Sequence, residues 1–141
     1  LNKPGIALSE MAGVHALTDV TGFGLLGHTL ELARGATLTA QLNMAHIPLL
    51  PNVQRLALSG CVTGASDRNW AGYGHDIVLA PAITPVQKIL LTDPQTSGGL
   101  LVSCDDHTVP EVLDLFMRAG FAQAAVIGEM LRGPAQVKVN I

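Results

Sequence analysis

Residues 18–28 read TDVTGFGLLGH, and the glycines at positions 22, 24 and 27 follow the spacing G-x-G-x-x-G. This spacing is typical of dinucleotide-binding folds, in which a strand precedes the glycines and a helix follows them. Such folds also place an acidic residue about 20 positions later, where it binds the ribose. No Asp or Glu lies between Glu31 and Asp67, and the Gly-Lys-Ser/Thr of a P-loop does not follow. The glycines therefore do not predict a dinucleotide site.

The residues of this segment support two other interpretations. Gly22 and Gly24 let backbone N–H groups approach an anion at the start of a helix, where negative charge is favoured. Asp19 precedes them, and its carboxylate would bind a Mg²⁺ ion that a phosphate also binds. Alternatively, Asp19 or Thr21 caps the helix and the glycines permit close packing, which is the interpretation that the local sequence alone favours. Both interpretations stay open at this point.

A second turn-rich segment, DPQTSGG at residues 93–99, has a similar composition. Backbone N–H groups in such a loop form concavities that bind anions, and the candidate residues are Thr96, Ser97, Gly98 and Gly99. Turn chemistry alone also explains the Asp-Pro pair and the two glycines, and it is the favoured interpretation.

Residues 60–76 form a long Gly-rich connection that holds the only Trp and the only Tyr of the chain. With Arg68 and Asn69, the side chains of Trp70 and Tyr73 either face a ligand or partner, or attach the connection to the sheet. The five histidines show no metal-ligand spacing. His15 and His28, which flank the first motif, are expected to form local hydrogen bonds.

The rest of the chain mixes short strands with amphipathic helices. Alternation over TLTAQLNMA predicts a strand whose inner face carries Leu38, Ala40, Leu42 and Met44. We expect strands at residues 14–20, with Asp19 brought to the end of the strand, and at 37–45, 77–80, 100–104, 124–130 and 136–141. We expect helices from residue 24 to a stop at Gly35, with Leu26, Leu30 and Ala33 on one face, and at 53–58, 84–91 and 108–120. Thr84 and Pro85 suit the cap and the first turn of the third helix. This order predicts an α+β fold with a mixed sheet covered by helices, in one domain over residues 1–141.

Composition excludes several classes of function. The formal net charge is −3, and the eight Lys and Arg residues form no basic stripe, so we expect no nucleic-acid partner. No apolar run approaches the ~20 residues of a membrane span, so we expect no membrane partner. Cys61 and Cys104 form no metal or disulfide pattern, which favours a reducing, cytoplasmic setting.

Three stretches together are similar to one family. GVHALTDVTGFGLLGHTLELARG, VTGASDRNW and LLTDPQTSGGLLVSC, at residues 13–35, 62–70 and 90–104, resemble the C-terminal domain of the selenide, water dikinase (selenophosphate synthetase) family, in the same order. The resemblance implies the fold of the C-terminal domain of aminoimidazole ribonucleotide synthetase. It also implies a phosphotransferase reaction in which selenide, ATP and water give selenophosphate, AMP and orthophosphate with Mg²⁺.

The resemblance also implies roles for individual residues. The Asp of TDVTGFG is a Mg²⁺ ligand in the family, which assigns that role to Asp19, with Thr21 and Gly22 next to the nucleotide. A carboxylate before a glycine-rich helix start suits a metal that offsets phosphate charge. The implied part of the TSGG residues is less defined.

The family's catalytic Cys or selenocysteine, its Lys and most ATP contacts lie in an N-terminal segment that nothing in this chain matches. We therefore expect no catalytic residue here and a longer enzyme that forms a homodimer mainly through that other domain. The alternatives are a non-catalytic binding or regulatory module on the same fold, and another ATP-dependent member of the superfamily.

Overall fold

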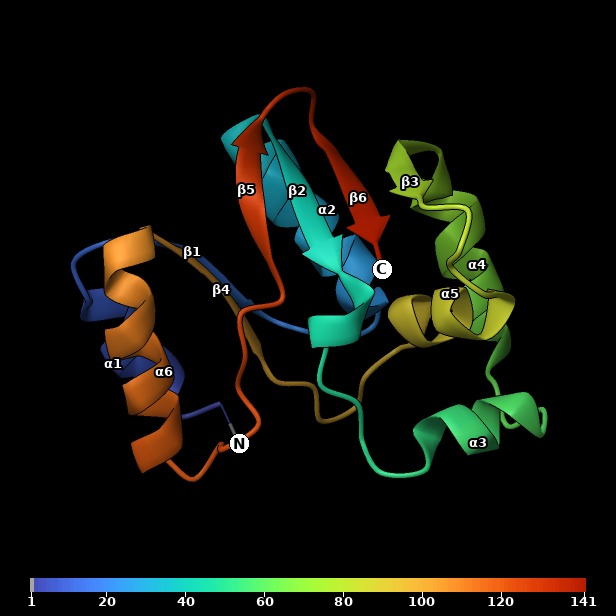
Figure 1. The fold of residues 1–141 in the computed structure, drawn as a ribbon, viewed down its shortest axis with the longest axis horizontal. Coiled ribbons are helices and arrows are strands. Elements are labelled where there is room, and N and C mark those ends of the chain that lie inside the picture. The colour runs from blue at the N-terminus through green and yellow to red at the C-terminus, as the bar shows by residue number, and fades with distance from the viewer. Residues whose placement is uncertain (1) are drawn as a thin grey trace.

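The strands form two separate sheets in the computed structural model, which describes residues 2–141 (Figure 1). The strands are β1 (Val14–Asp19), β2 (Leu38–Asn43), β3 (Ile77–Leu79), β4 (Leu100–Cys104), β5 (Gly128–Arg132) and β6 (Gln136–Asn140). The α-helices are α1 (Pro4–Glu10), α2 (Gly24–Ala36), α3 (Val53–Leu58), α4 (Gly64–Tyr73), α5 (Pro85–Thr92) and α6 (Val109–Arg118), and short 3-10 helices lie at Met44–His46, Gly74–Asp76 and Asp106–Thr108.

The larger sheet has the strand order β3-β6-β2-β5. Strand β6 runs parallel to both β2 and β3, whereas β5 runs antiparallel to β2. The sheet is therefore mixed, and helix α2 packs against β2 and β6. This arrangement confirms the predicted α+β class with helices on a mixed sheet.

The smaller sheet is an antiparallel ribbon of β1 and β4, which lie side by side in Figure 1. Asp19, the last residue of β1, is opposite Leu100, the first residue of β4. Helix α1 packs on β1 and on α6. Separate pairing of these two strands was not evident in the sequence pattern, and it sets the position of Asp19 at one end of the ribbon.

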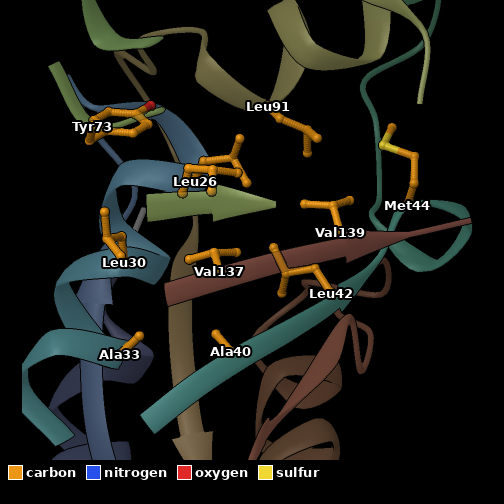
Figure 2. Packing of buried hydrophobic residues seen from close by; sticks show 11 residues of the cluster. Leu26, Leu30, Ala33, Ala40, Leu42, Met44, Tyr73, Leu91, Val137 and Val139 are labelled. Atoms are coloured by element: carbon orange, nitrogen blue, oxygen red, sulfur yellow. The ribbon is translucent and has the colours of Figure 1, made fainter. Parts of the chain in front are cut away.

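The hydrophobic core lies between α2 and the larger sheet, and helices α4 and α5 close it (Figure 2). Leu26, Leu30 and Ala33 recur at helical spacing on α2 and are buried, as predicted. Figure 2 shows them facing side chains of the two parallel strands, namely Ala40, Leu42, Val137 and Val139. Burial of these aliphatic groups stabilises the fold by roughly 25 cal/mol per Å² of apolar surface removed from water.

The strand predicted at residues 37–45 is confirmed over Leu38–Asn43, with Ala40 and Leu42 buried. Leu38 is only partly buried, and Met44 is buried but belongs to the following 3-10 helix. Thr39, predicted on the outer face, is also buried, and its hydroxyl is satisfied there by donating to the carbonyl of Pro134 at 2.7 Å.

The connection predicted at residues 60–76 is wrong, because most of it is helix α4. The Thr63 side chain accepts a hydrogen bond from the Ala65 N–H and caps the helix. Ser66, Trp70 and Tyr73 then follow at the three- and four-residue spacing of one helical face. Tertiary contacts along that face outweigh the weak helix propensity of the glycines in this segment.

Smaller differences concern element ends. Helix α2 continues through Gly35 and ends at Ala36, where Thr37 takes the left-handed conformation with φ 55°. The strand predicted at 124–130 begins only at Gly128.

Helix α1 was not predicted at all; it begins at Pro4, a favoured first-turn residue, and buries Leu8. In residues 2–141 no helix has the length and apolar character needed to cross a membrane.

Candidate functional site

Asp19 lies at the C-terminal end of β1 with its side chain exposed. This placement confirms the expected position, because the carboxylate neither sits in mid-helix nor packs on core aliphatics. Strand β1 positions Asp19 by pairing it with Leu100, and the next residue, Val20, extends the pairing through its N–H to the Gly99 carbonyl at 2.9 Å. The carboxylate is thus held on a paired backbone while its oxygens stay open to solvent.

The three glycines of the first motif have different roles. Gly24 begins α2 with φ 69°, and a Cβ there would lie 2.6 Å from the Thr92 carbonyl carbon. At Gly27 a Cβ would lie 2.5 Å from the Cβ of Phe23. Both glycines are therefore required for close packing. Gly22, in contrast, is exposed, and within residues 2–141 no atom lies within 4 Å of the position of its Cβ, so a ligand can approach its backbone from that side.

The second motif lies directly against the first. The Gln95 N–H donates to the Thr21 carbonyl at 3.0 Å, and the Val20 carbonyl occupies the space that a Cβ at Gly98 would fill. Together with the bond between Val20 and Gly99, these contacts join residues separated by more than seventy positions. Thr96 and Ser97 are exposed at the tip of this loop. The structure therefore brings the two candidate loops into one site.

Helix α4 binds the glycine segment and the end of α5, which precedes the DPQTSGG loop, through two of its side chains. The Asn69 side-chain amide donates to the carbonyls of Gly22 and Thr92, each at 2.9 Å. The Tyr73 hydroxyl donates to the carbonyl of Phe23 at 2.6 Å. Of the two interpretations of residues 60–76, these contacts favour attachment for Asn69 and Tyr73, although their hydrogen bonds go to Gly22, Phe23 and Thr92 and not to strands of the sheet. Trp70 is partly buried against the core, whereas Arg68 is exposed.

Tyr73 is the chain's only tyrosine, and burial raises its pKa to about 12 from an ordinary value of 10.0. The folded state therefore keeps the phenol proton at a pH where the unfolded chain has lost it. Tyr73 contributes stability that is complete below about pH 10 and is lost as the pH rises toward about 12. We expect the free energy of unfolding to fall in this window by up to about 1.4 kcal/mol per pH unit. Urea unfolding across the window measures it.

Tyr73→Phe is the control, because it retains the ring and removes the titrating group. Its stability should lack this component, and the difference between the two curves isolates Tyr73 from the lysines that titrate nearby in pH. Alkaline absorbance titration of the wild-type chain reports tyrosinate directly. A phenol that titrates near pH 10, or equal slopes in both proteins, would contradict the buried, hydrogen-bonded placement.

His28, a residue of α2, contacts the first motif at Thr21. Its ring lies 3.0 Å from the Thr21 hydroxyl oxygen through Nε2 and 2.8 Å from a Glu31 carboxylate oxygen through Nδ1. The expected local hydrogen bonding is confirmed for His28. The partner of His15 is instead distant in the sequence, because its Nε2 lies 2.9 Å from the carboxylate of Asp105, 90 residues away. That contact lowers the pKa of the Asp105 carboxyl. Sequence reasoning missed Gln95 and named Asn69 without its contact to the motifs, since neither residue type nor spacing signals such a contact.

The residues around Asp19 suit a shared metal ion rather than a self-contained metal site. In residues 2–141 no three His, Cys, Asp or Glu side chains come close enough together to hold one. Mg²⁺ commonly takes one or two protein carboxylates and completes its shell with water and substrate phosphates. One exposed carboxylate beside the open backbone of Gly22 fits that pattern, because it leaves the remaining coordination positions free.

Residues 3–140 match the family described as AIR synthase related protein, C-terminal domain, and the chain belongs to this family. Its curated relatives include selenide, water dikinases. The one from Pseudomonas straminea is 61% identical over 140 residues, which are 99% of this chain and 39% of the relative. The one from Burkholderia orbicola is 60% identical over 139 residues, again 99% of this chain and 39% of the relative. The chain therefore spans about two-fifths of the length of these relatives and is confirmed as similar to that part of them.

Solved structures with the same fold include E. coli HypE, a hydrogenase maturation protein. One HypE structure superimposes with a TM-score of 0.66 at 18% sequence identity, over 96% of this chain and 35% of HypE. HypE in a HypE–HypF complex gives a TM-score of 0.66 at 12% identity. At these identities the likeness concerns the fold alone.

Proposed function

We propose that residues 1–141 are the C-terminal domain of a selenophosphate synthetase, whose reaction converts selenide, ATP and water into selenophosphate, AMP and orthophosphate. The observation that carries the proposal is the meeting of the TDVTG and TDPQTSGG segments at the end of the ribbon. The identity to selenide, water dikinases of 48% or more over nearly the whole chain supports the same reaction. Fold likeness to HypE does not favour a second reaction, because it extends only to the backbone.

In this proposal Asp19 is a ligand of a Mg²⁺ ion that ATP phosphates also bind. The ion, when present, offsets negative charge on the phosphates and orients them. The chain's own part is to hold one carboxylate at a fixed point on the ribbon and to present open backbone at Gly22. Thr21, Thr96, Ser97, Gly98 and Gly99 shape this wall of the site, with the exposed Thr96 and Ser97 facing the nucleotide.

The nucleophile, a Lys and most nucleotide contacts belong, in the same proposal, to an N-terminal domain of the enzyme. The partners are then that domain, ATP and selenide, with a homodimer in the full-length enzyme and a cytoplasmic location. The net charge of −3 agrees with this division, because this domain alone does not balance the charge of a triphosphate.

The direct test is the activity of the full-length enzyme that contains this chain. We expect AMP and orthophosphate to appear from Mg·ATP only when selenide is present, with a selenium-bearing phosphorus species visible by phosphorus NMR. Selenide-independent release of ADP would indicate another ATP-dependent chemistry of the superfamily. Absence of any ATP turnover, with selenide and Mg²⁺ both supplied, would indicate a binding or regulatory module instead.

The 141-residue chain by itself should bind Mg·ATP weakly and should not hydrolyse it. Asp19 alone offers too few ligands, since Mg²⁺ gives up its water reluctantly. Isothermal titration of the chain with Mg·ATP measures the affinity, and circular dichroism checks that the chain is folded. Titration of the full-length enzyme is the positive control. Micromolar binding by the 141 residues would contradict the shared-site proposal and show a complete nucleotide site within them.

A further inference from the structure

His28 is a nearly buried histidine on α2, with its side chain 8% exposed. Both ring nitrogens have partners, because Nε2 lies 3.0 Å from Thr21 Oγ1 and Nδ1 lies 2.8 Å from Glu31 Oε2. The ring of Phe23 packs beside it with centroids 5.7 Å apart. A buried imidazole with two partners has a defined orientation and a defined distribution of protons.

The chemistry of the three groups sets the direction of each hydrogen bond. The Glu31 carboxylate only accepts, so the Nδ1 of His28 carries the proton and donates. In the neutral imidazole Nε2 is then an acceptor, and the Thr21 hydroxyl donates to it. We propose that Glu31, His28 and Thr21 form a positioning relay that fixes the Thr21 side chain and, with it, the segment from Asp19 to Gly22.

Thr21 joins more parts of the site than any other residue of that segment. Its hydroxyl binds His28, while its carbonyl accepts from the Gly24 N–H at 3.1 Å and from the Gln95 N–H at 3.0 Å. Thr21 therefore connects its own segment, residues 19–22, to α2 and to the DPQTSGG loop at residues 93–99. His28 acts on Asp19 through this residue. Thr21 is likewise a positioning residue, because its hydroxyl proton is directed to His28 and not to a phosphate oxygen.

The relay is tested first without any assay of activity. Isotope-labelled histidine in the 141-residue chain reports by NMR which ring nitrogen carries the proton at mildly alkaline pH, where imidazoles are neutral. Loss of one signal in His28→Gln identifies the residue among the five histidines. We expect the proton on Nδ1 in the wild-type chain. In Glu31→Ala we expect the population to shift toward the form with the proton on Nε2. The Glu31 side chain is 53% exposed, so its removal should leave the chain folded. A wild-type proton on Nε2, or no response to Glu31→Ala, overturns the relay.

The consequence for the metal rests on the proposed function and is tested in the full-length enzyme. Groups that orient a metal ligand typically change metal affinity or activity roughly 10- to 100-fold when removed. We expect Thr21→Val, which keeps the shape and loses the hydroxyl, to raise the Mg²⁺ concentration for half-maximal rate by that factor. Thr21→Ser, which keeps the hydroxyl, should restore it, and Glu31→Ala should show a smaller rise in the same direction.

High Mg²⁺ should recover much of the Thr21→Val rate, whereas a merely unfolded or distorted variant would not respond. Equal Mg²⁺ dependence in the Val and Ser variants overturns the positioning role. If Asp19→Asn has wild-type activity while the NMR result holds, the relay stands as a structural feature and the metal proposal fails. The two outcomes are thus separable.

Discussion

Asp19→Asn should reduce ATP turnover of the full-length enzyme by about 100-fold or more while leaving the fold intact. The amide has the same shape as the carboxylate but no charge, so it is a poor ligand for Mg²⁺. A metal that stabilises phosphoryl-transfer charge contributes several kcal/mol, and about 3 kcal/mol corresponds to about 100-fold in rate. The exposed position of Asp19 means that the change disturbs no packing. Steady-state release of AMP measures the loss.

Asp106→Asn is a matched control, because Asp106 is also exposed but lies beyond β4 at the opposite end of the ribbon from Asp19. It makes the same chemical change and should leave turnover near wild type. Both variants should unfold at the wild-type urea midpoint. Full activity of Asp19→Asn would assign Asp19 a purely structural position before the helix, and equal losses in both variants would indicate a nonspecific charge effect.

The elements that local patterns define were predictable from the sequence. The Leu26, Leu30 and Ala33 spacing identified the buried face of α2, and alternation identified β2. Thr84 and Pro85 marked the start of α5, where the structure shows a capping box with Gln87. Each of these signals lies within a few residues, so tertiary contacts have little opportunity to override it.

Helix α4 was not predictable in the same way. Its glycines at 64 and 72 lower helix propensity, and the contacts that stabilise it reach far along the chain. Asn69 binds carbonyls 47 and 23 residues away, and Tyr73 binds one 50 residues away. Patterns of a single sequence window do not contain such information.

The candidate site shows the same division between local and distant signals. The position of Asp19 at a strand end follows from residues 14–20 alone, and the likeness of the two loops to one family assigned them to one enzyme. That the loops touch depends on the ribbon of β1 and β4, which local periodicity does not specify. The Glu31–His28 part of the relay is local, at i and i+3, whereas the effect of His28 on the site requires the turn at Thr21.

Gly98→Ala should destabilise the chain by about 3 kcal/mol or more, because the new methyl group would occupy the position of the Val20 carbonyl oxygen. Val20 is fixed by its own N–H bond to Gly99, so neither backbone can withdraw without separating the end of the ribbon. The backbone of Gly98 is not in the left-handed region, and the expected cost is therefore steric rather than conformational. The urea midpoint of the 141-residue chain measures it.

The neighbouring glycine supplies the control for this prediction. Among residues 2–141 no atom lies within 4 Å of the position that a Cβ at Gly99 would take, and its φ also lies outside the left-handed region. Gly99→Ala should therefore leave the stability of the chain nearly unchanged or raise it by up to about 1 kcal/mol, because the substitution lowers the entropy of the unfolded chain. In the full-length enzyme Gly98→Ala should also lose activity with Asp19 intact, because the two loops that hold the carboxylate no longer meet. Equal stability of the two variants would contradict the close approach of Gly98 to Val20, and with it the joining of the motifs on which the proposed site depends.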